Sequence, residues 1–300
     1  MPASDLRFVQ FPHPGREHAP RTGDMGWNTG DHRRKFLHTK GRYLDEDDAV
    51  RSGELVFWGE WEPPSEIPCR WTRSDQLPRA LHRPCWYRPP GDWPRQNTDP
   101  WVFGSQMRYS NCKQVRRLPG SAETEPTAMQ ELPVGSVICF GSTIQGEFCL
   151  DTVFVMASAE PWVPSEIEAL EVDEAFKVCT GQSLAAADEH ADQPFTLYRG
   201  ATFEDPVEGI YSFVPARRAD DADPRFPRPG IRLPDLINPT STQAARGLRE
   251  PRTVAEVQQA WNEVRCQVLQ ADLLLGVWLN TPPRCDHLSA TSPTGTGQGC

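Results

Sequence analysis

Side chains that can transfer protons are concentrated near the amino terminus of the chain, within residues 8–66. His13 and Glu17 follow the first short strand-like stretch, and His32 follows a loop bounded by glycines. Glu60 lies in an aromatic stretch further along. Imidazole and carboxyl groups are the commonest general acids and bases in enzymes. We therefore predict that His13, Glu17, His32 and Glu60 are catalytic residues.

Aromatic, amide and arginine side chains accompany these groups. Arginine binds phosphate or carboxylate through its planar fork. Amide groups can read the edges of bases, and aromatic rings can stack on them. These residue types indicate a cleft that binds an anionic ligand carrying a flat base. The candidate ligand-binding residues are Trp27, Asn28, Arg33, Arg34, Trp58, Asn97, Trp101, Asn111 and Gln114.

The stretch Leu55–Glu62 begins as a buried strand and ends with alternating aromatic and acidic residues. Because neighbouring strand residues point to opposite faces, Trp58, Glu60 and Glu62 share one face and Trp61 lies on the other. Carboxyl groups beside an indole can have a raised pKa and act as general acids. The alternative is that they pair with arginines of the preceding loop.

The histidine-rich segment also contains candidate metal ligands. His13, His18 and His32 lie among acids, and these residue types bind zinc or iron. However, the basic run of residues 33–35 would place positive charge near a bound cation, which is unfavourable. We expect a metal-free pocket, and the sequence identifies no cofactor.

Cys112 is a candidate nucleophile because Lys113 follows it, and a neighbouring cation lowers the pKa of a thiol. The sequence shows no histidine paired with it. The alternative is that Cys112 is a buried structural thiol.

The net charge of −10 is unevenly distributed along the chain. Residues 1–120 carry 19 Lys and Arg against 15 Asp and Glu, whereas the remainder carries 12 against 26. A basic first part favours an anionic ligand, and an acidic second part argues against extended non-specific binding to duplex DNA. The pattern fits a nucleotide or a single extruded or terminal base. The oligomeric state is not indicated.

Thirty prolines among 300 residues favour short strands joined by ordered loops over a helical bundle. Helices are expected over residues 164–184 and 253–270, the second preceded by a capping box at Thr253 and Glu256. We predict an α+β fold with a mixed or barrel-like β core, long proline-rich loops and two principal helices.

Three regions are expected. Residues 1–157 form a β-rich, basic region with the candidate site, and residues 158–284 form an α+β region packed in the same globule. Residues 285–300 are rich in Ser, Thr and Gly and are predicted to be disordered. No apolar stretch approaches the length of a membrane helix, and no signal peptide is evident, so a cytoplasmic location without membrane contact is expected.

Residues 132–157 contain two apolar stretches, PVGSVICFGS and GEFCLDTVFVMA, separated by a short turn. This pair resembles the strand entries of small β-barrels such as the PUA-like domains, which include readers of modified bases. The motif set as a whole is similar to an uncharacterised bacterial protein family, and that similarity implies no catalytic residue.

Two functions follow as hypotheses. The first is an enzyme that modifies or processes a nucleotide or a nucleic-acid base in a cleft rich in His, Glu, Trp and Arg. The alternative is a non-catalytic module that binds a modified base or nucleotide in a defence or regulatory system. A binding module needs an aromatic cage with few titratable groups, whereas an enzyme needs converging acids and histidines.

Overall fold

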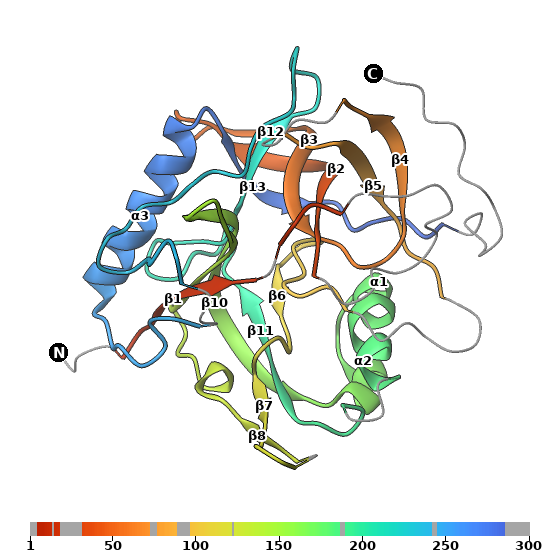
Figure 1. Cartoon of the computed structure of the whole chain (residues 1–300), viewed down its shortest axis with the longest axis vertical. Coiled ribbons are helices and arrows are strands. Elements are labelled where there is room, and N and C mark those ends of the chain that lie inside the picture. The colour runs from red at the N-terminus through yellow and green to blue at the C-terminus, as the bar shows by residue number, and fades with distance from the viewer. Residues whose placement is uncertain are drawn as a thin grey trace.

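The computed structural model describes residues 5–13, 15–18, 32–72, 77–88, 97–121, 123–186, 190–241 and 245–285. Two mixed β-sheets dominate the fold (Figure 1), with 40% of residues in strands and 15% in helices. The sheets are open and do not close into a barrel. The predicted β-rich α+β class is therefore confirmed, and the barrel-like alternative is wrong.

The first sheet has five strands in the order β1-β9-β10-β11-β6. Strand β1 pairs with β9 in parallel, and the other pairs are antiparallel. The strands are β1 (Phe8–Pro12), β6 (Arg108–Tyr109), β9 (Val137–Ile144), β10 (Glu147–Trp162) and β11 (Phe195–Gly200).

The second sheet has six strands in the order β13-β12-β3-β2-β5-β4, and β13 also pairs with β2. Its strands are β2 (Arg34–Leu44), β3 (Val50–Glu60), β4 (Ser65–Arg70), β5 (Ala80–Pro84), β12 (Val214–Arg218) and β13 (Leu274–Leu279). A separate hairpin joins β7 (Val115–Arg117) and β8 (Thr124–Pro126). Each large sheet thus combines strands from before and after residue 157.

The central strands are buried on both faces, and each face packs into its own apolar cluster. On β9, Ile138 and Phe140 belong to the cluster that also contains Phe57, whereas Val137 and Cys139 belong to the other. This alternation follows from the two-residue period of a strand. Near-continuous apolar runs result, as expected for strands covered on both faces.

Helix α3 (Val254–Gln270) confirms the predicted carboxy-terminal helix and its capping box. Its apolar stripe, which includes Trp261 and Val264, packs into the second cluster, and α3 lies along one side of the molecule (Figure 1). None of the helices in the described part of the chain is long and apolar enough to cross a membrane.

The single helix predicted over residues 164–184 is wrong. The segment divides into η2 (Pro164–Ala169), α1 (Glu174–Phe176), the π-helical η3 (Lys177–Gln182) and α2 (Ser183–Ala185). The backbone is extended at Leu170, and the Asp173 side chain then accepts a hydrogen bond from the amide of Phe176. Asp173 therefore starts a new helix, because a capping carboxylate favours a fresh N-terminus.

Two further features complete the sheets. Residues 67–100 contain most of β4 and all of β5. Strand β11 pairs with β10 and β6, whereas β12 pairs with β13 and β3. A short η1 (Ala128–Gln130) precedes β9.

Candidate active site

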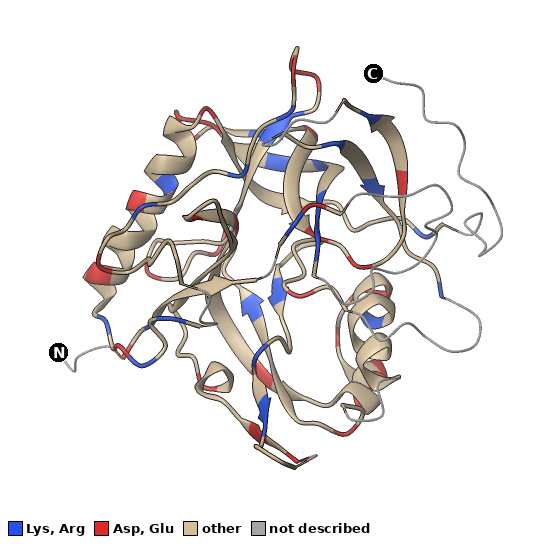
Figure 2. Cartoon of the chain, viewed as in Figure 1, with Lys and Arg blue, Asp and Glu red and all other residues tan. Residues whose placement is uncertain are grey.

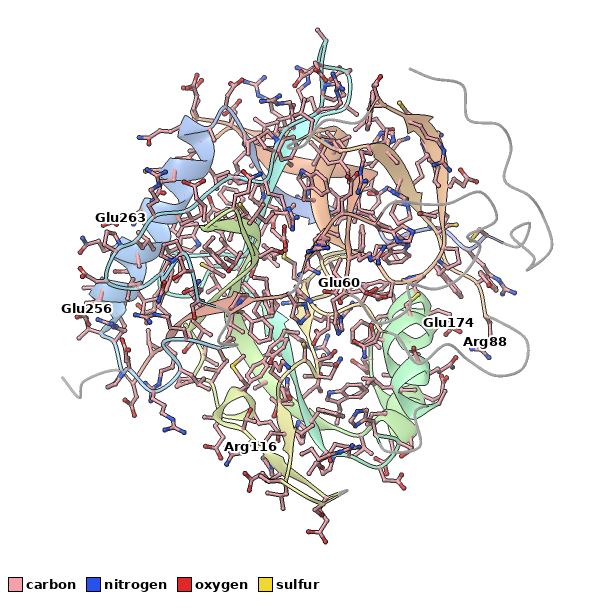
Figure 3. The ribbon with its side chains drawn as sticks, in the orientation of Figure 1. Glu60, Arg88, Arg116, Glu174, Glu256 and Glu263 are labelled. Carbon is pink, nitrogen blue, oxygen red and sulfur yellow. The ribbon has the colours of Figure 1, made fainter. Side chains whose placement is uncertain are left out.

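The carboxylate of Glu60 lies near the centre of the molecule, whereas the other residues labelled in Figure 3 lie at its periphery. Glu60 is the last residue of β3 and is 5% exposed. Its Oε2 accepts hydrogen bonds from His13 Nδ1 at 2.9 Å and from Arg34 Nη1 at 2.7 Å. Its Oε1 lies 3.4 Å from His32 Nδ1. Burial of this charge is tolerated because donors surround it.

The register of strands β2 and β3 places the donor Arg34 beside Glu60. Arg34, the first residue of β2, is paired directly with Glu60 across the hairpin. Its Nε donates to Asp151 Oδ2 at 2.7 Å, so one fully buried guanidinium bridges two buried carboxylates. Asp151 lies at the point where the pairing of β10 with β9 shifts register, and such irregularities re-aim side chains. Arg228 Nη1 lies 3.7 Å from Asp151 Oδ1.

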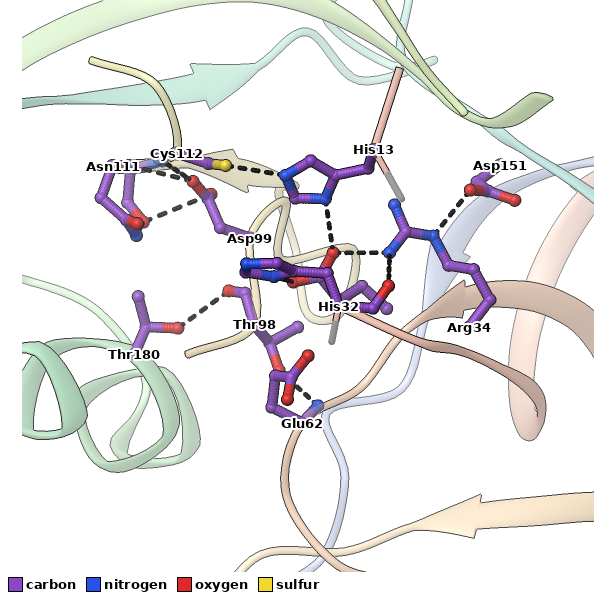
Figure 4. A network of polar contacts seen from close by, with 12 residues as sticks. His13, His32, Arg34, Glu62, Thr98, Asp99, Asn111, Cys112, Asp151 and Thr180 are labelled. Atoms are coloured by element: carbon purple, nitrogen blue, oxygen red, sulfur yellow. Dashed lines mark hydrogen bonds and ion pairs between the residues drawn. The ribbon is translucent and has the colours of Figure 1, made fainter. Parts of the chain in front are cut away.

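His13 links Glu60 to a thiol (Figure 4). It follows β1, and its amide donates to the carbonyl of Gly141 on β9 at 2.7 Å. Its Nε2 lies 2.8 Å from Cys112 Sγ. The Glu60 carboxylate can only accept, so His13 carries its proton on Nδ1 and Nε2 accepts from the thiol. The resulting Cys112–His13–Glu60 arrangement has the order nucleophile, base and orienting carboxylate.

The loop that carries Cys112 is folded around a buried aspartate. Asp99 Oδ2 accepts from the amides of Asn111 at 3.0 Å and Cys112 at 2.7 Å, and its Oδ1 accepts from the amide of Ser110 at 2.9 Å. The Tyr109 hydroxyl donates to the carbonyl of Cys112. These bonds fix the backbone on both sides of the thiol.

The segment that holds Asp99 is in turn anchored to two other elements. The Thr98 hydroxyl accepts from the Glu62 amide at 3.1 Å, and Thr180 Oγ1 in η3 donates to the carbonyl of Thr98 at 3.1 Å. Figure 4 shows these contacts below the thiol. The π-helical segment η3 thus supports the loop that carries Cys112 through one backbone carbonyl, that of Thr98.

The electrostatic balance of the site favours a neutral thiol and a neutral imidazole. Burial opposes ionisation of Glu60, but the charge of Arg34 and the contact with His13 hold its pKa well below the usual range. Burial lowers the pKa of His13, although Glu60 opposes this effect. Burial raises the pKa of the Cys112 thiol well above its usual value, and the charges of Asp99 and Glu60 act in the same direction.

His32 differs from His13. Its side chain is 35% exposed, and the hydrogen bond to Glu60 raises its pKa despite partial burial. The two imidazole rings lie 4.8 Å apart between centroids. A second carboxyl group, that of Glu62, is fully buried, and burial together with the charge of Glu60 raises its pKa to about 8. Glu60 is therefore ionised and Glu62 protonated at neutral pH.

The structure brings four sequence-predicted site residues into one place: His13, His32, Glu60 and Arg34. Asn111 adjoins them beside Cys112 and is 8% exposed. Asn97 is half-buried in the segment that leads to Thr98 and Asp99. Arg33 adjoins the site in sequence and is half-buried. Trp27 and Asn28 lie outside the described residues.

Four other predicted residues are engaged elsewhere. Glu17 forms an ion pair with the Arg79 side chain and accepts a hydrogen bond from the Arg79 backbone amide, instead of contacting His13. Trp58 packs on Phe36 and Arg228. Trp101 is fully buried among aromatic rings, and the fully buried Gln114 amide pairs with the backbone of Thr196. Neither Trp101 nor Gln114 has a surface free to contact a ligand.

The basic first part of the chain does not form a separate basic face. Figure 2 shows Lys and Arg interspersed with Asp and Glu over both sheets. The reason is that each large sheet contains strands from both parts of the chain. The positive charge relevant to the site comes from buried arginines that are already paired with carboxylates.

The pairing of Cys112 with His13 could not be found in the sequence, because 99 residues separate them. Lys113, the feature that singled out Cys112 in the sequence, has a minor effect, since burial outweighs that cation in setting the thiol pKa. Comparison with known proteins adds nothing to this geometry, as no family model, curated protein or solved structure matches the chain.

Replacing Glu62 by Gln is expected to weaken the pH dependence of stability. Folded Glu62 has a pKa of about 8, above that of an unfolded glutamate, so its stabilisation is complete at acidic pH and is lost as pH rises towards 8. Between about pH 5 and about pH 7, wild-type unfolding free energy should fall by up to about 1.4 kcal/mol per pH unit from this group. Urea unfolding at both pH values measures the slope.

Glu263→Gln is the matched control, because Glu263 is exposed on α3 and should leave the wild-type slope unchanged. Equal slopes in Glu62→Gln and wild type would show that Glu62 is not held protonated in the folded protein.

Proposed function

We propose that this protein is a cysteine-dependent enzyme that forms a covalent intermediate on Cys112. The observation that carries the proposal is the 2.8 Å contact between Cys112 Sγ and His13 Nε2, with Glu60 bonded to the other nitrogen of the same ring. Nucleophile, base and orienting group within hydrogen-bond reach are the geometric signature of nucleophilic catalysis. Acyl transfer or hydrolysis is the reaction class that this set supports best.

The thiol is neutral at rest, so His13 acts as a general base. As Sγ attacks an electrophilic carbonyl carbon, the S–H proton passes to His13 Nε2 and a C–S bond forms. Glu60 stabilises the imidazolium that results. His13 then returns the proton to the leaving group, whose bond to carbon breaks. Water, deprotonated by His13, releases the acyl group and restores the thiol.

The negative charge that develops on the substrate oxygen needs a donor other than the amide of Cys112. That amide already donates to Asp99. His32 is suitable for this role because it is partly exposed, lies next to His13 and has a raised pKa. Its Nδ1 faces Glu60, and its Nε2–H remains available to the oxyanion.

The substrate remains a prediction. Binding of a nucleotide or nucleic-acid base, which the sequence suggests, would rely on Asn97, Asn111 and Arg33, since the indole of Trp101 is buried. The alternative of a non-catalytic binding module is less well supported, because converging acids, histidines and a thiol exceed what an aromatic cage requires. In a cytoplasmic location, which is also a prediction, Cys112 would stay reduced.

A divalent-metal site is the second candidate. Ligand atoms of His13, His32 and Glu60 all lie within 4.8 Å of one another. Two features favour the thiol mechanism. The guanidinium of Arg34 lies 2.7 Å from the same carboxylate, which disfavours a nearby dication, and His13 Nδ1 and Glu60 already bond to each other.

Elemental analysis distinguishes these candidates. Protein purified without an affinity tag should contain zinc and iron well below one equivalent, and His32→Asn should leave that content unchanged. Stoichiometric metal that is lost in His32→Asn would make metal-assisted chemistry the leading function instead.

Alkylation by iodoacetamide tests the proposed nucleophile. Cys112 should react in the wild type, and His13→Gln should slow its reaction on the order of a hundredfold, since glutamine cannot accept the thiol proton. Peptide mapping of timed reactions gives the rate at each cysteine. The exposed free thiol of Cys266 is an internal control whose rate should not change.

Cys112 reacting at the same rate in wild type and His13→Gln would contradict the proposal. Loss of reactivity at both cysteines in the variant would point to a reagent artefact, and the reaction would be repeated at matched pH. A substrate search follows with acyl esters, amides and nucleotide pools, using Cys112→Ala as the inactive control.

A further inference from the structure

A cavity of about 610 Å³ lies away from the Cys112 site. Its volume falls within the range of small-molecule sites. The turn between β9 and β10, the segment 230–239 and Arg246 form its walls. Its apolar side chains are mainly aliphatic, with Phe148 as the one aromatic ring: Ile231, Leu233, Pro234, Ile237 and Pro239.

The walls are held by hydrogen bonds, so the cavity is preformed. The amide of Ile231 donates to the carbonyl of Phe148 at 2.9 Å. The side chain of Gln267 on α3 accepts from the amide of Arg232 at 2.8 Å and donates to its carbonyl at 3.0 Å. Further along the same segment, the fully buried side-chain amide of Gln10 donates to the Asn238 carbonyl and accepts from its amide, both at 2.9 Å.

The cavity contains two arginines with different environments. Arg232 forms an ion pair with Glu147, which also lines the cavity. Arg246 exchanges backbone hydrogen bonds with Gln10 at 3.0 Å, but its guanidinium has no hydrogen-bond or ion-pair partner among the described residues. A half-buried guanidinium without an acid, at the edge of an aliphatic cavity, is complementary to a carboxylate attached to an apolar chain.

We propose that this cavity binds an amphipathic carboxylate, with its aliphatic chain against Ile231, Leu233 and Ile237 and its carboxylate on Arg246. Burial of the ligand's aliphatic chain away from water supplies the affinity, and the Arg246 guanidinium supplies the selectivity for a charged head group. The proposal is independent of the chemistry at Cys112. It is also specific, because an uncharged ligand with the same chain lacks the group that Arg246 would bind.

Isothermal titration of the full chain with decanoate tests the proposal. Saturable binding of one equivalent is expected, and 1-decanol should bind at least about tenfold more weakly. Arg246→Met should weaken decanoate binding by a similar factor while leaving decanol binding unchanged. Arg249→Met is the matched control, since Arg249 is exposed and does not line the cavity, and it should bind decanoate as the wild type does.

No saturable binding of decanoate to the wild type would overturn the proposal. Equal affinity for decanoate and decanol would also overturn it, and this comparison needs no variant. A third contradiction would be Arg246→Met binding decanoate as tightly as Arg249→Met does.

Discussion

The buried carboxylate of Glu60 is the interaction on which the site depends. A charge this deeply buried is stable only where donors and opposite charge surround it, and His13, Arg34 and His32 supply them. Arg34 requires a second acid, which Asp151 provides. Removing one partner from such a pair costs about 3–5 kcal/mol, because it leaves an uncompensated charge. The two sheets are therefore joined at their centre by groups that also orient the candidate base.

This arrangement also determines the protonation of the site. Glu60 stays ionised and holds the proton of His13 on Nδ1, which leaves Nε2 to accept from Cys112. Burial lowers the pKa of this imidazole and raises that of the thiol, which favours the neutral form of both. His32, bonded to the other carboxylate oxygen and more exposed, instead has a raised pKa. Two histidines thus acquire different roles from a single carboxylate, through burial and position.

Local signals in the sequence predicted what depends on local structure. The capping box of Thr253 and Glu256 predicted the start of α3. Four of the residues expected at the site, including His13 and Arg34, do converge. Residue type alone could not separate Trp101, which packs in the core, from a ring that stacks on a ligand. The pairing of Cys112 with His13 needs the parallel β1–β9 pair and the loop around Asp99, and no local pattern encodes these long-range contacts.

The protonation state of His13 tests the central claim most directly. Nuclear magnetic resonance of the full chain, with isotope-labelled histidine nitrogens and assignment by His13→Gln, reports which ring nitrogen carries the proton. The account predicts a neutral His13 at neutral pH, protonated on Nδ1 and unprotonated on Nε2, beside a Cys112 thiol. A doubly protonated His13 beside a thiolate, or a neutral ring protonated on Nε2, would contradict it.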